Sequence, residues 1–185
     1  AKYNSFSKRR TGQKRISPSL RRNRLDKQEK YAAFYFYWSQ QDKTMIRYHL
    51  VILKKPYLDA ILEGQKQIES RFTVTKRYAF GRVQAGDKLF LKASSGPVCA
   101  TAAVAAVKNF QNLTPKQIIE IKQQYNHYIL GDDEYWRSKM NCKFGFLAWL
   151  KDARAIEPVR ICKKDWRAWV VLTEKENFGL LKIGL

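Results

Sequence analysis

Short apolar runs separated by glycine turns occupy residues 45–107, and their order limits the fold of this chain more than any other feature. Residues 45–53 (Met-Ile-Arg-Tyr-His-Leu-Val-Ile-Leu) are rich in β-branched and aromatic side chains, which favour a strand. Pro56, followed by apolar residues at helical spacing, predicts a short helix that ends at Gly64. Further strands, separated by glycine turns, are predicted for residues 69–74, 88–92 and 98–107.

A polar cluster of Lys66, Glu69 and Arg71 lies where the predicted helix gives way to the second strand. Side chains alternate along a strand with a period of two, so Glu69 and Arg71 share one face, and Lys66 can reach the same side from the turn. A carboxylate between two cations makes a polar pocket suited to an anionic or hydrogen-bonding ligand. The alternative is a solvated surface ion pair that only fixes the turn.

Three segments together resemble the ASCH domain family, a branch of the PUA-like superfamily of small β-barrels that handle RNA. They are Gly-x-Lys-x-x-Glu-x-Arg at residues 64–71, Gly-Asp-Lys-Leu at residues 86–89, and residues 146–158, which resemble a late strand ending in an arginine-containing turn and a proline. The resemblance extends from His49 to Leu172. It implies an α+β fold, in which a small mixed β-barrel is flanked by helices and preceded by an extended basic arm.

The charge of the chain points to a polyanionic partner. Lysine and arginine number 36 against 16 acidic residues, which gives a formal net charge of +20. Residues 1–30 alone hold 11 basic residues against 2 acidic ones. RNA, either ribosomal RNA or another structured RNA, is therefore the predicted partner. DNA is the alternative, and protein neighbours within a particle are a further expectation.

Residues 1–44 are predicted to form a basic amino-terminal extension, and residues 45–185 the ASCH/PUA-like domain. The first thirty residues mix cations with Ser, Asn, Gly and Pro, and they cannot bury enough apolar surface to fold alone. Ser19 is a candidate cap for a helix leading to an aromatic patch at residues 34–38, which would pack on the barrel, stack on bases or form a strand. The nucleic-acid contacts predicted in the extension are Lys8, Arg9, Arg10, Lys14, Arg15, Arg21, Arg22 and Arg24.

Binding of structured RNA, within a ribonucleoprotein particle such as a ribosome, is the predicted function. DNA binding is a more distant alternative, in which a base would be extruded into a pocket flanked by Trp136, Trp149 or Trp166, and the sequence does not separate it from RNA binding. The segment 163–167 is expected to project cations and an indole toward a ligand. The contacts predicted in the folded domain are Lys66, Arg71, Lys76, Arg77 and Arg82.

An enzyme is the alternative function, and the sequence leaves it open. The resemblance implies two activities, since some ASCH-like proteins are amidohydrolases acting on N4-acetylcytidine and others are ribonucleases. In the amidohydrolases a lysine matching Lys66 activates a threonine three residues later, where this chain has Glu69, a poor substitute for a hydroxyl nucleophile. In a ribonuclease, Lys66, Glu69 and Arg71 would supply the cation, the base and the stabiliser of the transition state.

The second half of the chain supplies the expected core. Thr114 and Pro115 begin a helix. The buried stripe of the helix is predicted to be Ile118, Ile119, Ile121 and Tyr125. The acidic cluster at residues 132–134 is predicted to cap a helix rather than bind a metal.

Residues 144–150 and 168–172 are predicted to be strands that close the barrel. The tail, residues 178–185, is expected to dock on the core or on a partner.

Several classes of protein are excluded by the sequence. No run approaches the roughly 20 apolar residues of a membrane span, and we expect a protein that is not secreted. Cys99, Cys142 and Cys162 lack Cys-x-x-Cys spacing, so neither a disulfide framework nor a zinc site is predicted. His49 and His127 are interpreted as structural or surface residues. We expect no cofactor and no metal, and a reducing compartment inside the cell, either cytoplasm or organelle matrix.

Overall fold

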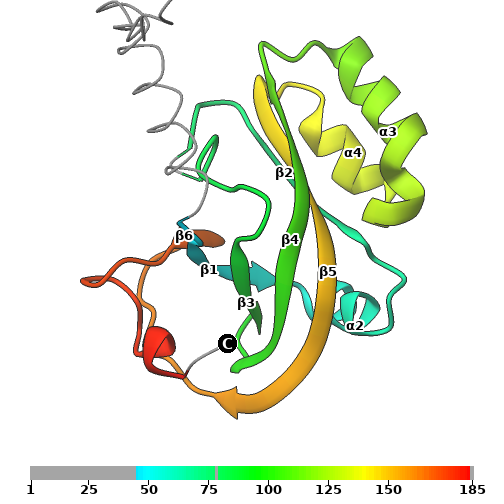
Figure 1. The fold of residues 1–185 in the computed structure, drawn as a ribbon. Coiled ribbons are helices and arrows are strands. Elements are labelled where there is room, and N and C mark those ends of the chain that lie inside the picture. Colours follow the sequence, from blue (N-terminus) through cyan, green and yellow to red (C-terminus); the bar gives the residue numbers. More distant parts are fainter. Residues whose placement is uncertain (1–44, 78, 184–185) are drawn as a thin grey trace, which may run out of the picture. The chain divides into compact units, whose positions relative to one another are not determined.

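One curled, mixed sheet of six strands forms the centre of the part of the chain that the structure describes (Figure 1). The computed structural model describes residues 45–77 and 79–183. The strands are ordered β2-β5-β4-β3-β1-β6 across the sheet, and β1 and β3 run parallel while the other neighbouring pairs are antiparallel. Their bounds are β1 Tyr48–Leu53, β2 Ile68–Thr73, β3 Lys88–Ala93, β4 Val98–Gln111, β5 Phe144–Val159 and β6 Trp169–Val171.

Helices flank this sheet, as the α+β prediction requires. In Figure 1, α3 and α4 lie together on one side of the long strands β4 and β5, and η1 lies on the other side. The sheet is a half-barrel, so the predicted small mixed β fold is confirmed in this open form. The helices among the described residues are α2 Lys55–Leu62, α3 Pro115–Ile129, α4 Asp133–Lys139 and the short 3-10 turn η1 Leu180–Lys182.

Local signals in the sequence position most of these elements correctly. Pro56 lies in the first turn of α2, and Gly64 follows the helix with φ of +75°, a conformation that favours glycine. In α3 the Thr114 side chain accepts a hydrogen bond from the Gln117 backbone, and the Gln117 side chain returns to the Thr114 backbone, which forms a capping box. Asp132 caps α4, which confirms the capping role predicted for the acidic cluster.

Three expectations about single elements were wrong. Ile119 is 45% exposed, because the buried stripe of α3 turns away from it. Strand β4 continues to Gln111, four residues beyond its predicted end. Residues 151–158 do not form a turn but extend β5, which bends through register shifts against β4 and a left-handed residue, Asp152, with φ of +54°.

Alternation along the strands divides the sheet into two faces. The inner face carries the apolar cluster that includes Leu89, Ala102, Phe146 and Trp169, and it packs against α2. The outer face is covered in two places. Helices α3 and α4 cover the start of β5 around Leu147, while the carboxy-terminal tail covers β3 and β6. Leu180 of the tail is fully buried, which confirms that the tail docks on the core.

The predicted extension, residues 1–44, lies outside the described residues. Its eight cationic contacts, the Ser19 cap, the aromatic patch and the proposed domain division therefore stay predictions. Among the described residues, no helix combines the length and apolar character needed to cross a membrane. No group of His, Cys, Asp and Glu side chains suited to a metal ion occurs in that part of the chain. The three cysteines are free.

Candidate ligand-binding pocket on the inner face

Strand β2 carries the predicted polar cluster, and the structure brings its three members together. Glu69 and Arg71 share the inner face, and Arg71 Nη2 lies 3.0 Å from Glu69 Oε1. Lys66 Nζ lies 3.5 Å from Glu69 Oε2. The Glu69 side chain is only 7% exposed, so the carboxylate is a buried bridge between the two cations. The predicted common face is thus confirmed.

Lys66 belongs to the interior of the protein. Its side chain is 4% exposed, and its ammonium donates hydrogen bonds to the carbonyls of Ile68 (2.8 Å) and Ile129 (2.6 Å). Burial lowers the pKa of Lys66, and the nearby Glu69 charge opposes that shift. The ammonium therefore ties the start of β2 to the end of α3 from inside the protein.

Arg71 reaches the surface that Lys66 does not. Its Nη2 donates to the Ile52 carbonyl at 3.0 Å, and its guanidinium lies 5.6 Å from the ring centre of Trp169. Its Nε is buried without a hydrogen-bond partner among the described residues. A buried donor without an acceptor costs about 1–3 kcal/mol, and such a cost calls for a structural or functional reason.

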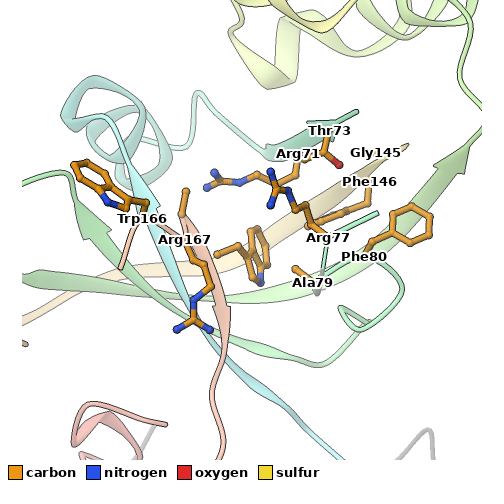
Figure 2. A pocket seen from close by; sticks show the side chains of 11 residues that line it. Arg71, Thr73, Arg77, Ala79, Phe80, Gly145, Phe146, Trp166 and Arg167 are labelled. Atoms are coloured by element: carbon orange, nitrogen blue, oxygen red, sulfur yellow. The ribbon is translucent and has the colours of Figure 1, made fainter. Parts of the chain in front are cut away.

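A pocket of about 530 Å³ opens beside Arg71 on this inner face. In Figure 2 the guanidinium groups of Arg71 and Arg77 lie between Trp166 and Phe80, whereas that of Arg167 points away from them. The wall thus combines aromatic rings with two arginine side chains. The residues lining the pocket are Arg71, Thr73, Arg77, Ala79, Phe80, Gly145, Phe146, Trp166, Arg167, Ala168 and Trp169.

Two details of β5 and β6 shape this wall. A Cβ on Gly145 would lie 2.4 Å from Phe72 Cδ1, so only glycine lets β5 approach β2 closely here. A buried hydrogen bond orients the Trp169 ring, because its Nε1 donates to His49 Nδ1 at 3.2 Å. The other ring nitrogen of His49 must then carry the proton, and it donates to Asp87 Oδ2 at 2.8 Å. The structural role predicted for His49 is confirmed.

Trp166 is held at the pocket by a network of charges rather than by packing. Its side chain is fully exposed. On either side of it, Lys163 and Arg167 both bond Asp165, and Arg167 also bonds Glu176. Hydrogen bonds from Arg167 hold the pKa values of Asp165 and Glu176 below their usual ranges. An exposed indole on an ordered loop is available for stacking on a ligand ring.

The remaining predicted cations and indoles divide between the pocket and other sites. Arg77 lines the pocket, and Lys76 Nζ lies 5.5 Å from the ring centre of the pocket residue Phe80. Arg82 does not line it, and its carbonyl accepts a hydrogen bond from Arg47. Trp136 is 3% exposed and packs on the outer-face cluster, where Trp149 also lies. Of the three candidate indoles, only Trp166 faces this pocket.

Sequence reasoning missed Trp169 and Phe80, which complete the aromatic wall. Trp169 lies within a run that predicts only a strand, and nothing near it in the sequence indicates that His49 orients it from 120 residues away. Phe80 follows Arg77 in an irregular segment between β2 and β3. Arginines offer planar forks for phosphate or carboxylate oxygens, and the rings offer stacking surfaces. The pocket therefore suits a flat ligand with negative charge.

Comparisons with known proteins agree with this architecture. The model of the ASCH domain family matches residues 51–160, which is more than half of the chain. No curated protein matches the sequence. The structure is similar to the crystal structure of ASCH from Zymomonas mobilis, with 14% sequence identity, a TM-score of 0.56, and coverage of 74% of this chain and 94% of that chain.

Two variants of the Zymomonas mobilis protein give the same TM-score of 0.56 and also cover 74% of this chain. One carries phenylalanine in place of a tyrosine, with 14% identity and 97% of its chain covered. The other carries alanine in place of a serine, with 15% identity and 95% covered. Similarity at this level of identity shows the fold, and the family match confirms the resemblance drawn from the residues. The chain belongs to the ASCH domain family.

Proposed function

We propose that this ASCH domain is an RNA-binding module that takes a base of structured RNA into the pocket on the inner face. One observation carries the proposal, namely the fully exposed Trp166 beside the guanidinium groups of Arg71 and Arg77. Stacking on an aromatic ring contributes about 1–3 kcal/mol per base, and arginines bind the adjoining phosphates. An extruded or unpaired base with its phosphate matches both components of the wall.

The charge of the whole chain supports a polyanionic partner. A net charge of +20 attracts RNA from a distance and holds it without regard to sequence, while the pocket adds a specific contact. The cations of residues 1–44 and Lys76 would supply further phosphate contacts. A ribonucleoprotein particle such as a ribosome, in the cytoplasm or an organelle matrix, is the setting we propose.

Lys66 and Glu69 have an indirect role in this proposal. Glu69 accepts from Arg71, and Lys66 neutralises and anchors Glu69 from the interior. This arrangement fixes the guanidinium of Arg71 at the pocket wall before a ligand arrives, which lowers the entropic cost of binding. The Gly-x-Lys-x-x-Glu-x-Arg motif therefore prepares the site, and Arg71 is its member that contacts RNA.

Substitution of Trp166 tests the stacking contact directly. We expect Trp166→Ala to weaken binding of a single-stranded or looped RNA by about 1–3 kcal/mol, measured by fluorescence anisotropy at fixed salt. Arg77→Gln should weaken the same complex through loss of a phosphate contact. Lys116→Gln is the matched control, because Lys116 is an exposed cation of α3 that lines neither pocket.

Two results would contradict the proposal. The first is a parent protein with no affinity for RNA at low ionic strength, and the second is equal affinity of the parent and Trp166→Ala. A duplex of the same sequence and the corresponding DNA distinguish the partner, since the proposal requires preference for RNA with accessible bases. Release of products from these oligonucleotides would instead support the enzyme alternative.

A further inference from the structure

A second hollow, of about 340 Å³, lies on the outer face of the sheet, away from the pocket of Trp166. It spans β3, β4 and β5, and Thr101 and Ala103 project into it from the middle strand. The neighbouring residues Ala100 and Ala102 point into the inner-face core, so alternation places Thr101 and Ala103 on the opposite face. Its lining residues are Lys88, Thr101, Ala102, Ala103, Asp152 and Arg154.

The register of the sheet explains both the hollow and its charge. Ala103 pairs with Lys88 on one side and with Lys151 on the other. Thr101 pairs with Arg154. Directly paired residues of antiparallel strands share a face, so three long cationic side chains surround two short ones. The small residues leave the space, and Lys88 and Arg154 are the cations that line it.

These cations are not neutralised by the part of the chain that the structure describes. Lys88, Lys151 and Arg154 form no ion pair or side-chain hydrogen bond with those residues, in contrast to the paired Lys122 and Arg167. Asp152 lines the same hollow and is also unpaired within that region. Cations gathered at neighbouring sheet positions repel one another and destabilise the sheet unless an anion joins them. The rim therefore has a net positive charge that an anion would offset.

We propose that the outer-face hollow binds a phosphate group, with Lys88 and Arg154 as its charged donors and the Thr101 hydroxyl as a third donor. Thr101 is 3% exposed and makes no side-chain hydrogen bond within the described residues, so its hydroxyl is available at the base of the hollow. The ammonium of Lys88 on β3 and the guanidinium of Arg154 on β5 come from the two strands that flank β4, so they can reach such a group from two sides. The phosphate is either a linkage of bound RNA, which rests on the proposed function, or a free phosphate.

Titration with inorganic phosphate tests the hollow without RNA. Backbone amide shifts followed by NMR should show saturable changes at Thr101, Ala103 and Arg154, relative to sodium chloride of equal ionic strength. The double variant Lys88→Gln with Arg154→Gln should lose these changes, since each lost charged contact weakens binding about tenfold. Thr101→Val, which keeps the shape of the side chain, should weaken phosphate binding while its NMR spectrum remains that of a folded protein.

A substitution at Asp152 should change phosphate affinity in the opposite direction. Asp152→Asn removes the one carboxylate of the rim and keeps a residue that tolerates a positive φ, so phosphate affinity should rise. The matched control Lys116→Gln should leave it unchanged. The proposal would be overturned if phosphate caused no changes in the amide shifts of the parent protein. It would also be overturned if the same changes persisted in the double variant.

Salt dependence of RNA binding identifies the source of the phosphate. If the hollow holds an RNA linkage, the double variant should reduce the slope of log affinity against log salt by about 0.7 for each contact with single-stranded RNA, or about 1.4 in all. Saturable binding of inorganic phosphate with an unchanged RNA slope assigns the hollow to a free phosphate. A parent that does not bind RNA refutes the proposed function, and the phosphate titration still decides this proposal separately.

Discussion

At the scale of single residues, Lys66 is a buried cation beside Glu69, the ion-pair partner of the pocket residue Arg71. Its ammonium satisfies two carbonyls and faces Glu69, and it is nearly absent from the surface. A buried charge is tolerated only when it is paired and fully hydrogen-bonded, and this one is both. The position therefore requires a long cationic side chain, and its loss should affect the fold before it affects binding.

Lys66→Met should lower the free energy of unfolding by about 3–5 kcal/mol, because it leaves a buried carboxylate and two buried carbonyls without their shared donor. Urea denaturation followed by circular dichroism measures the change. Lys55→Met provides the control, since Lys55 pairs with Asp59 on an exposed helix surface and its loss should change the free energy of unfolding far less. Equal effects of the two variants would show that Lys66 is not a structural cation.

At the scale of elements, the segment between β5 and β6 carries a network of ion pairs centred on Arg167. Arg167 bonds Asp165 and Glu176, and the resulting loop carries the exposed Trp166. Both carboxylates have pKa values below their usual 3.8 and 4.5, chiefly because Arg167 hydrogen-bonds to them. Because both pKa values are lowered by folding, the ion pairs stabilise the folded loop fully above the pKa values of the unfolded chain. That stabilisation is lost as the pH falls through the pKa values of the folded state.

The loop should accordingly keep its conformation from pH 7 to pH 5 and lose it only below about pH 4. Carbon-detected NMR titration of the carboxyl groups measures this, with Asp165 and Glu176 expected to titrate below 3.8 and 4.5. In Arg167→Gln both values should rise toward the usual ones. Titration of the parent at the usual values would show that the ion pairs do not organise the loop.

At the scale of the whole molecule, local signals in the sequence were sufficient for the fold. Pro56 and Gly64 bound α2, Thr114 begins α3, and the alternation of Glu69 with Arg71 places both on one face. Each of these depends on residues only a few positions apart. Their order along the chain then indicated the family, which the match to residues 51–160 confirms.

Features that depend on distant residues were not predictable in the same way. Trp169 completes the pocket because His49 and Asp87 hold it, and the register of β3, β4 and β5 creates the outer hollow. The motif predicts RNA contact for Lys66, because no local pattern reports the Ile129 carbonyl, 63 positions away, that accepts from its ammonium. The sequence identifies the motif, whereas burial determines that Arg71 lines the pocket and Lys66 does not.

The basic extension and the folded pocket should contribute to RNA binding in separable ways. Removal of residues 1–44 would delete eight predicted phosphate contacts, and each contact contributes about 0.7 to the salt slope for single-stranded RNA. The slope of log affinity against log salt should therefore fall by up to about 6. Trp166→Ala in the full chain should lower affinity with the slope unchanged, because stacking releases no counterions. The truncated chain must give the NMR spectrum of a folded protein. If it then keeps the original salt slope, the extension does not bind phosphates, and the pocket is the only RNA contact still proposed on the inner face.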